Sequence, residues 1–125
     1  MNYREITSKR QFKDATGYSR KEFDLLHSDF EKTYYELRGQ SYEAYIEENV
    51  TEPPKLSTLG DCLFFTLFQL KNDMIWGSLG CAFGMAGSTA HDNFEYFLKI
   101  LETTLDKKKY YRSEHLKMRR ILKRM

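Results

Sequence analysis

The sequence of 125 residues is poor in cysteine and proline, with two of each, and it lacks a long apolar run. Its most apolar stretch, 62–70, includes Thr66 and Gln69 and is too short to cross a bilayer. Residues 1–5 are not followed by the apolar segment of a signal peptide. These absences argue against a membrane protein or a secreted protein, and we expect a cytoplasmic chain.

The two cysteines, Cys62 and Cys81, lie far apart and lack the spacing of metal ligands. Each has apolar neighbours in the sequence, so we expect two reduced, buried thiols rather than a disulfide. No metal site and no cofactor are expected.

Active-site patterns are also missing. His27, His91 and His115 lie in three different expected helices, and none belongs to a nucleophile motif or a metal motif. Carboxylates such as Glu47 and Glu48 fit a solvated helix face, and no glycine-rich phosphate loop follows a strand. We therefore expect a protein that is not an enzyme.

The net charge of +2 conceals an uneven distribution. Residues 1–21 carry six basic and two acidic side chains, residues 22–105 carry five and fourteen, and residues 106–125 carry nine and two. The balances are +4, −9 and +7, so a bound polyanion would be held by the two ends of the chain. The alternative is a solvated, lysine-rich tail that needs no partner.

Apolar residues recur at helical spacing throughout, and no alternation typical of a strand occurs. Ser19 and Glu22 form a capping-box pattern that predicts a helix to about residue 37. A short helix is expected over 41–48. A central helix over 57–71, capped by Ser57, is apolar all round and is expected to be buried among the others.

The fold class expected is therefore all-α, a small helical bundle. It divides into an N-terminal arm or short helix over 1–14, a helical domain over 15–105, and a basic tail or helix over 106–125. Apolar residues within the tail predict a weakly amphipathic last helix over 113–123.

The stretch 75–101 predicts a helix-turn-helix, and its spacing fits a helical hairpin in the core of a bundle equally well. The first helix is expected over 75–83, followed by Gly84 at a position that favours positive φ. Gly80 is small enough to allow a second helix to approach closely, Met85 fills the corner, and Ser88 or Thr89 can cap the second helix. The buried face of that helix is expected to comprise Ala90, Phe94, Phe97, Leu98 and Leu101. Its outward face is expected to comprise Gly87, Ser88, Thr89, His91, Asp92 and Glu95.

Three motifs, in this order, resemble the N-terminal helix-turn-helix domain of bacterial insertion-sequence transposases of the DDE superfamily. The first is a threonine-glycine turn before a Glu-Phe pair, at Thr16, Gly17, Glu22 and Phe23. The second is the lysine-leucine-serine start of a long apolar helix, at Lys55, Leu56 and Ser57. The third is the phenylalanine-glycine-hydrophobic corner before a serine-threonine pair, at Phe83, Gly84, Met85, Ser88 and Thr89. The resemblance covers about residues 12–105.

Two positions depart from the family pattern. Gly80 stands where the family usually has alanine, which keeps the position small. Asp92 and Asn93 stand where the family often has a basic residue and then an aliphatic one. Because Asp92 and Glu95 repel phosphate, they weigh against strong DNA binding by this helix alone.

The resemblance implies a non-catalytic domain, because the family's catalytic carboxylates lie after this region. The expected chain is an N-terminal part of a transposase, or the product of a short first reading frame. Its expected partner is duplex DNA of transposon inverted repeats, with a catalytic transposase subunit or a second copy of the chain as further partners and no membrane. Base contacts are expected from Ser88, Thr89 and His91, and Asp92 is included among the DNA-binding residues without a separate role. Phosphate contacts are expected from Lys99, Lys107, Lys108, Lys109, Arg112, Arg119, Arg120, Lys123 and Arg124.

A second hypothesis is a helical module for protein–protein interaction or dimerisation that has no DNA specificity of its own. The acidic second helix favours this alternative, while the basic ends and the resemblance favour DNA binding. Tyr110 and Tyr111, set among basic residues, suit nucleic-acid stacking or a simple linker equally.

Overall fold

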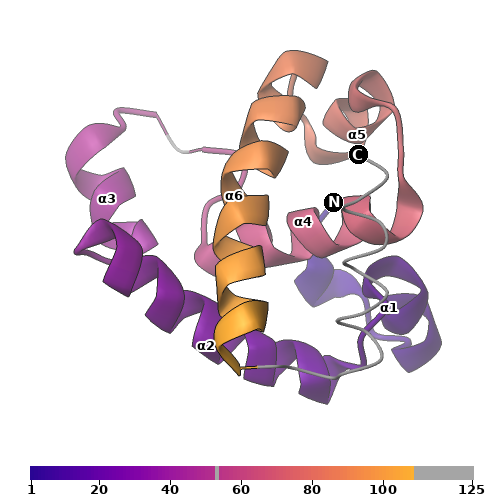
Figure 1. Ribbon diagram of the computed structural model, residues 1–125. Coiled ribbons are helices and arrows are strands. Elements are labelled where there is room, and N and C mark those ends of the chain that lie inside the picture. Colours follow the sequence, from indigo (N-terminus) through magenta and orange to yellow (C-terminus); the bar gives the residue numbers. More distant parts are fainter. Residues whose placement is uncertain (53, 109–125) are drawn as a thin grey trace.

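The computed structural model describes residues 1–52 and 54–108, and every regular element within them is a helix (Figure 1). The elements are η1 (Tyr3–Glu5), α1 (Lys9–Thr16), α2 (Arg20–Arg38), α3 (Tyr42–Asn49), α4 (Leu59–Asn72), α5 (Trp76–Phe83) and α6 (Gly87–Lys108). The expected all-α bundle is confirmed. In the described part of the chain, no helix combines the length and the apolar character needed to span a membrane.

Helix α4 lies at the centre, with α6 crossing it, α2 below it and α1 beside it (Figure 1). Its side chains are buried on every side, as the apolar pattern predicted. The buried members include Leu59, Cys62, Leu63, Phe64, Phe65, Leu67 and Leu70. The expected cap was wrong by one residue, because Thr58 caps the helix and forms a capping box with Asp61. The hydroxyl of Ser57 instead donates to the Asp61 carboxylate at 3.2 Å.

Helix α2 begins and ends as its sequence predicts. The side chain of Ser19 accepts a hydrogen bond from the Glu22 amide, and the Glu22 carboxylate accepts one from the Ser19 amide. Gly39 ends the helix with φ of 77°, a left-handed conformation that glycine adopts without a steric penalty. Helix α3 then starts at Tyr42, capped by Ser41.

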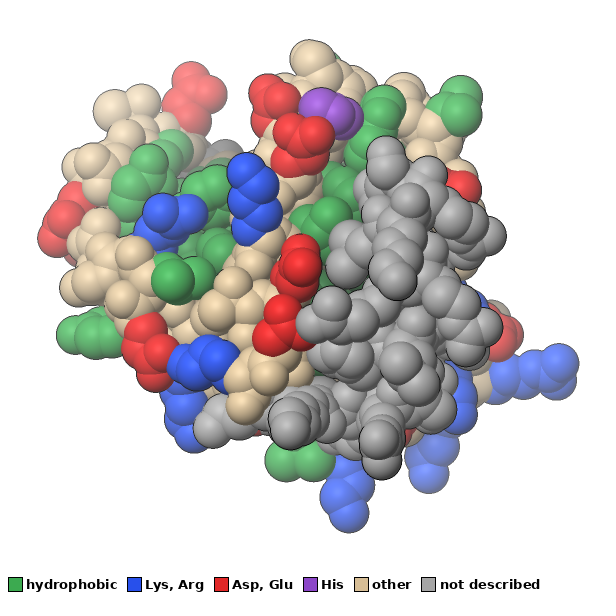
Figure 2. Space-filling model, viewed as in Figure 1, with side chains coloured by type: hydrophobic (Ala, Val, Ile, Leu, Met, Phe, Trp, Pro, Cys, Tyr) green, Lys and Arg blue, Asp and Glu red, His purple; other side chains and the backbone are tan. Residues whose placement is uncertain are grey.

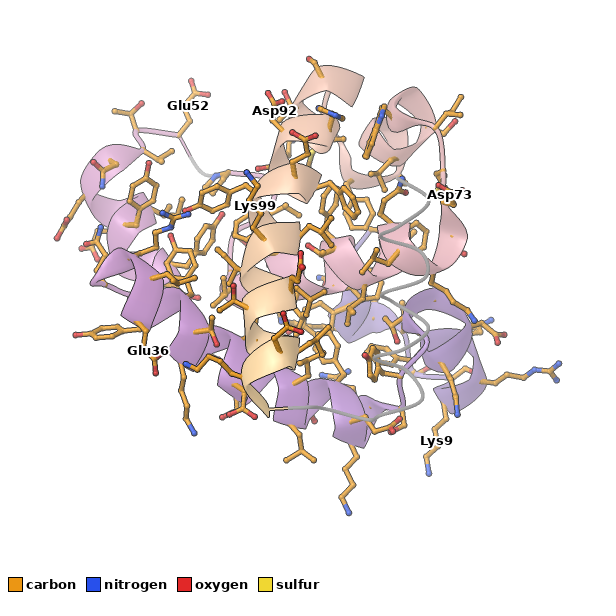
Figure 3. The ribbon with its side chains drawn as sticks, in the orientation of Figure 1. Lys9, Glu36, Glu52, Asp73, Asp92 and Lys99 are labelled. Atoms are coloured by element: carbon orange, nitrogen blue, oxygen red, sulfur yellow. The ribbon has the colours of Figure 1, made fainter. Side chains whose placement is uncertain are left out.

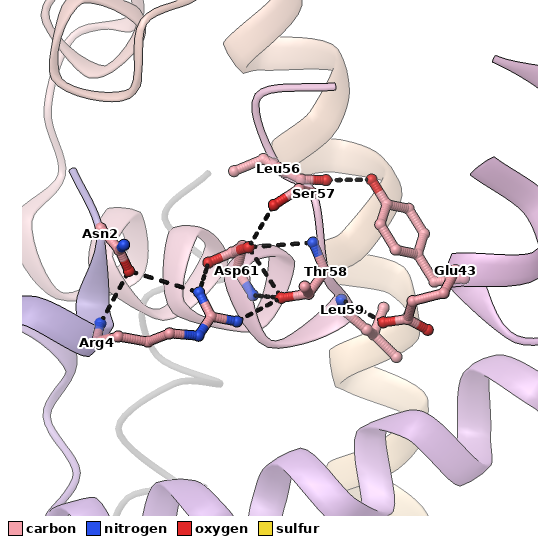
Figure 4. A network of polar contacts seen from close by, with 9 residues as sticks. Asn2, Arg4, Glu43, Leu56, Ser57, Thr58, Leu59 and Asp61 are labelled. Atoms are coloured by element: carbon pink, nitrogen blue, oxygen red, sulfur yellow. Dashed lines mark hydrogen bonds and ion pairs between the residues drawn. The ribbon is translucent and has the colours of Figure 1, made fainter. Parts of the chain in front are cut away.

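The N-terminal segment packs into the same core. The ring of Tyr3 stacks on that of Phe64 in α4, with centroids 5.5 Å apart. Arg4 donates to Asp61 and to the Thr58 hydroxyl, both at 2.9 Å (Figure 4). Phe12 of α1 is also buried. The short helix η1 is therefore fixed to α4 by ring stacking and by an ion pair.

The two cysteines differ in environment. Cys62 is buried in α4, and desolvation raises the pKa of its thiol well above the usual range, which keeps it protonated and unreactive. Cys81 is exposed, so the expectation of a buried thiol is wrong there. The cause is its position on α5, whose buried residues are Leu79, Gly80 and Phe83.

Candidate functional site

Helices α5 and α6 are joined by a three-residue turn, 84–86. Gly84 has φ of 75° and ψ of 33°, and its amide bonds back to carbonyls of α5. The next amide, that of Met85, donates to the Gly80 carbonyl at 2.8 Å. The predicted turn, with a left-handed residue at Gly84, is confirmed.

Gly80 is the tightest point of this unit. A Cβ atom placed there would lie 2.3 Å from the carbonyl oxygen of Met85 and 3.0 Å from the carbonyl carbon of Ala86. Both are backbone atoms and cannot rotate away. Gly80 does allow a close approach, but the prediction that the second helix makes it is wrong, because the atoms nearest to Gly80 belong to the turn.

Gly87 is not part of the free outward face that the sequence suggested. A Cβ atom at this position would lie 3.1 Å from the amide nitrogen of Gly77 in α5. The first residue of α6 therefore packs against α5. Close contacts at Gly80, before the turn, and at Gly87, after it, hold the turn against α5.

The expected cap of the second helix is also wrong. Helix α6 begins at Gly87, and the Ala86 carbonyl accepts the first helical hydrogen bond, from the Ala90 amide at 2.9 Å. Ser88 and Thr89 consequently lie inside the first turn, with exposed side chains. Their hydroxyl groups are placed where a ligand could reach them.

The buried face of α6 agrees with its predicted pattern. Ala90, Phe94, Phe97 and Leu101 are buried, and Leu98 is partly buried against the core. Ser88, Thr89, Asp92 and Glu95 form the exposed face of the first three turns. Figure 2 shows acidic side chains gathered along this exposed helix.

His91 occupies the edge between the two faces. Its ring meets Trp76 of α5 edge to face, with centroids 4.8 Å apart. Its Nδ1 lies 3.5 Å from Asp92 Oδ1, and its Nε2 lies 3.3 Å from Glu95 Oε1. The imidazole is therefore held by its neighbours, and part of it remains open to solvent. The sequence did not assign a role to Trp76, because only the fold brings it to His91.

Few cations of the predicted phosphate-binding set can be placed in the structure. Lys99 is exposed on α6, about two turns beyond Asp92 (Figure 3). Lys107 pairs with Glu36 of α2, an exposed contact of the kind that contributes little to stability. Lys108 ends α6, and its side chain is outside the described part. The other members of the predicted set lie outside the described residues, as does the predicted helix 113–123; they are Lys109, Arg112, Arg119, Arg120, Lys123 and Arg124.

We expect replacement of Gly84 by valine to destabilise the turn by about 1–3 kcal/mol, because a β-branched residue is strained at positive φ. The nearest side chain, that of Lys55, would lie 3.7 Å from the new Cβ, an ordinary contact, so the penalty is conformational. Chemical denaturation measures it. Gly84→Asn is the control, because asparagine tolerates this conformation, and equal losses in both variants would contradict the explanation.

In residues 1–52 and 54–108, no group of three or more metal-ligating side chains lies close enough together to hold an ion. Comparison of the chain with protein-family models, with curated proteins and with solved structures gives no match. The candidate site is therefore identified from its geometry alone. It consists of helices α5 and α6, with the first turns of α6 exposed.

Proposed function

We propose that the chain is a non-catalytic, cytoplasmic DNA-binding domain of the insertion-sequence transposase type, and that α5 and α6 form its helix-turn-helix. The observation that carries the proposal is the joint itself. An eight-residue helix is followed by a three-residue turn, with Gly84 at positive φ and no room for a side chain at Gly80. This joint leaves the first turns of α6 exposed, and in helix-turn-helix proteins those turns contact bases in the major groove.

The polar groups on these turns suit base edges better than phosphates. Hydroxyl groups such as those of Ser88 and Thr89 can donate to or accept from any base. The carboxylate of Asp92 can accept a hydrogen bond from the amino group of cytosine, which gives an acidic residue a place in the major groove. Packing against Trp76 limits the orientations of the His91 ring, so its position relative to the bases would be fixed before binding.

Attraction to the DNA backbone must come from elsewhere, because the exposed face of the first turns carries Asp92 and Glu95, and the first cation along α6 is Lys99. Phosphate contacts supply most of the affinity of DNA-binding proteins, while base contacts supply specificity. The basic tail remains the proposed source of part of this attraction. A catalytic transposase subunit would then provide the chemistry that this domain lacks.

A second function, protein–protein interaction, is supported by large apolar side chains that are exposed to solvent. Tyr35 and Leu37 of α2, Tyr45 of α3 and Tyr96 of α6 are large apolar side chains with exposed fractions of 59%, 50%, 43% and 38%. Exposed aromatic residues are enriched at protein interfaces. A dimer that forms through some of these side chains is compatible with DNA binding through the first turns of α6.

Selection of duplexes from a random-sequence library by the full chain tests the proposed function. We expect enrichment of a common sequence. The Ser88→Ala/Thr89→Ala variant should lose about 1–3 kcal/mol of discrimination for each base contact removed, with little change in its affinity for random duplex. The control is Ser28→Ala/Thr103→Ala, which removes the same groups from α2 and from the far half of α6. If no sequence is enriched, or if both variants lose equal selectivity, the proposal fails.

A further inference from the structure

Outside the α5–α6 unit, α1 and the beginning of α2 enclose an open groove of about 430 Å³. Cations dominate its lining, with Asp14 as the acidic member and Ser19 as a neutral one. The basic members are Lys9, Arg10, Lys13, Arg20 and Lys21. The sequence showed only that residues 1–21 carry a net positive charge, and the fold brings most of these cations together in one groove.

Most of these cations have no ion-pair partner among residues 1–52 and 54–108. Among the described residues, ion pairs engage Arg4 with Asp61, Lys32 with Asp29 and Lys107 with Glu36. In the groove only Arg20 has such a partner, Asp24, at 3.3 Å. The four remaining groove cations have exposed side chains and are available to a bound anion.

The side chain of Arg20 is held in place at one side of the groove by contacts with two aromatic rings. Its guanidinium carbon lies 5.4 Å from the ring centroid of Phe12 and 5.3 Å from that of Tyr3, both of which are buried. These cation–π contacts hold the charge against the core. The amides of Arg20 and Lys21 are in the first turn of α2, where backbone N–H groups have no acceptor inside the helix and favour an anion.

The arrangement suits a chain of phosphates better than a small ligand. Lys9 and Lys13 are one helical turn apart, about 6 Å along the axis of α1. One DNA strand carries a phosphate every 3.4 Å or so of duplex axis, so the two ammonium groups can reach neighbouring phosphates. The groove has long, exposed cations and lacks a buried polar side chain that would orient a small molecule.

We infer that the groove between α1 and α2 binds the sugar–phosphate backbone of duplex DNA, without reading its sequence. The inference rests on the proposed DNA binding and adds a site that the base-contacting turns do not include. Lys9 and Asp92 lie at opposite ends of the molecule (Figure 3). The groove therefore holds a segment of backbone that is remote from the bases contacted by α6, and it supplies attraction that the acidic exposed face of α6 lacks.

The test is a salt series of binding of the full chain to a duplex of random sequence and to the selected duplex. The groove variant is Arg10→Gln/Lys13→Gln, and the control is Lys32→Gln/Lys71→Gln, which removes the same charge from exposed positions outside the groove. Melting temperatures verify that both fold. We expect the groove variant to reduce the salt slope by about two units and the affinity for both duplexes on the order of 50-fold at 0.1 M salt. The ratio of the two affinities should not change.

The outcomes separate this inference from the proposed function. An unchanged salt slope in the groove variant, with sequence preference intact in the full chain, overturns the groove alone. Equal losses in the groove variant and the control also overturn it, because overall charge would explain them. Loss of preference by the Ser88→Ala/Thr89→Ala variant together with a reduced slope in the groove variant supports both.

Competing ligands define what the groove accepts. Inorganic pyrophosphate at a concentration equal to that of DNA phosphate should not displace the duplex, because it offers two phosphates to a site that spans several groups. Displacement by pyrophosphate, or binding of the chain to anionic phospholipid vesicles and not to duplex, overturns the assignment to DNA backbone.

Discussion

Replacement of Gly80 by alanine is expected to destabilise the protein by about 3 kcal/mol or more, since overpacking against backbone that cannot move is costly. The new methyl group would be placed 2.3 Å from the Met85 carbonyl oxygen. To accommodate it, the turn would have to move away from α5, which would also break the hydrogen bond from the Met85 amide to the Gly80 carbonyl. Thermal unfolding measures the loss, and at about 4–8 °C for each kcal/mol it amounts to more than 10 °C.

Gly77→Ala is the matched control, because it lies on the same helix and a Cβ atom there would meet nothing within 4 Å. Alanine is favoured over glycine in a helix by about 0.5–1 kcal/mol, so this variant should be as stable as the original or more so. If Gly80→Ala and Gly77→Ala have the same melting temperature, the close contact between Gly80 and the turn does not determine the stability of the fold.

Leu67→Ala should lower the free energy of unfolding by about 2–5 kcal/mol. Leu67 lies in the middle of α4 with no exposed surface, and three other helices pack around that helix. Truncation therefore leaves a cavity that neighbouring side chains fill only in part. Urea denaturation gives the free energy, and it also shows whether the transition remains cooperative.

Leu37→Ala is the control for this change. Leu37 lies near the end of α2 with half of its surface exposed, and exposed substitutions usually alter stability by less than about 0.5 kcal/mol. An unchanged midpoint for Leu67→Ala would remove that residue from the core and, with it, the central position of α4.

Local chemistry explains which features of the fold could be predicted. The capping box of α2 was predicted correctly because Ser19 and Glu22 are three residues apart and contact only each other's backbone. At α4 the same rule applied to Thr58 and Asp61, and the expectation missed it by choosing the preceding serine. Gly84 was identified because a helix end requires a left-handed residue, whatever surrounds it.

The candidate sites were harder to predict because they depend on elements that meet only in space. The contact between Trp76 and His91 requires α5 to fold back on α6, and the spacing of two residues in different helices does not encode their distance. Likewise, the sequence showed an excess of basic residues before residue 22. It could not show that Arg10 and Lys21 line one groove, because that depends on how α1 packs against α2.

The position of α6 has a consequence for the nascent chain. Helix α4 is apolar on every side, and its partners come from both ends of the sequence, with Tyr3 stacked on Phe64 and α6 crossing α4. During synthesis, α1 and α2 can cover α4 in part, but about thirty more residues must be added before α6 covers the rest. At 5–20 residues per second this interval lasts roughly 2–6 s. For that time we expect the nascent chain to present a partly covered, phenylalanine-rich helix, the kind of surface that chaperones bind, until packing of α6 ends the exposure.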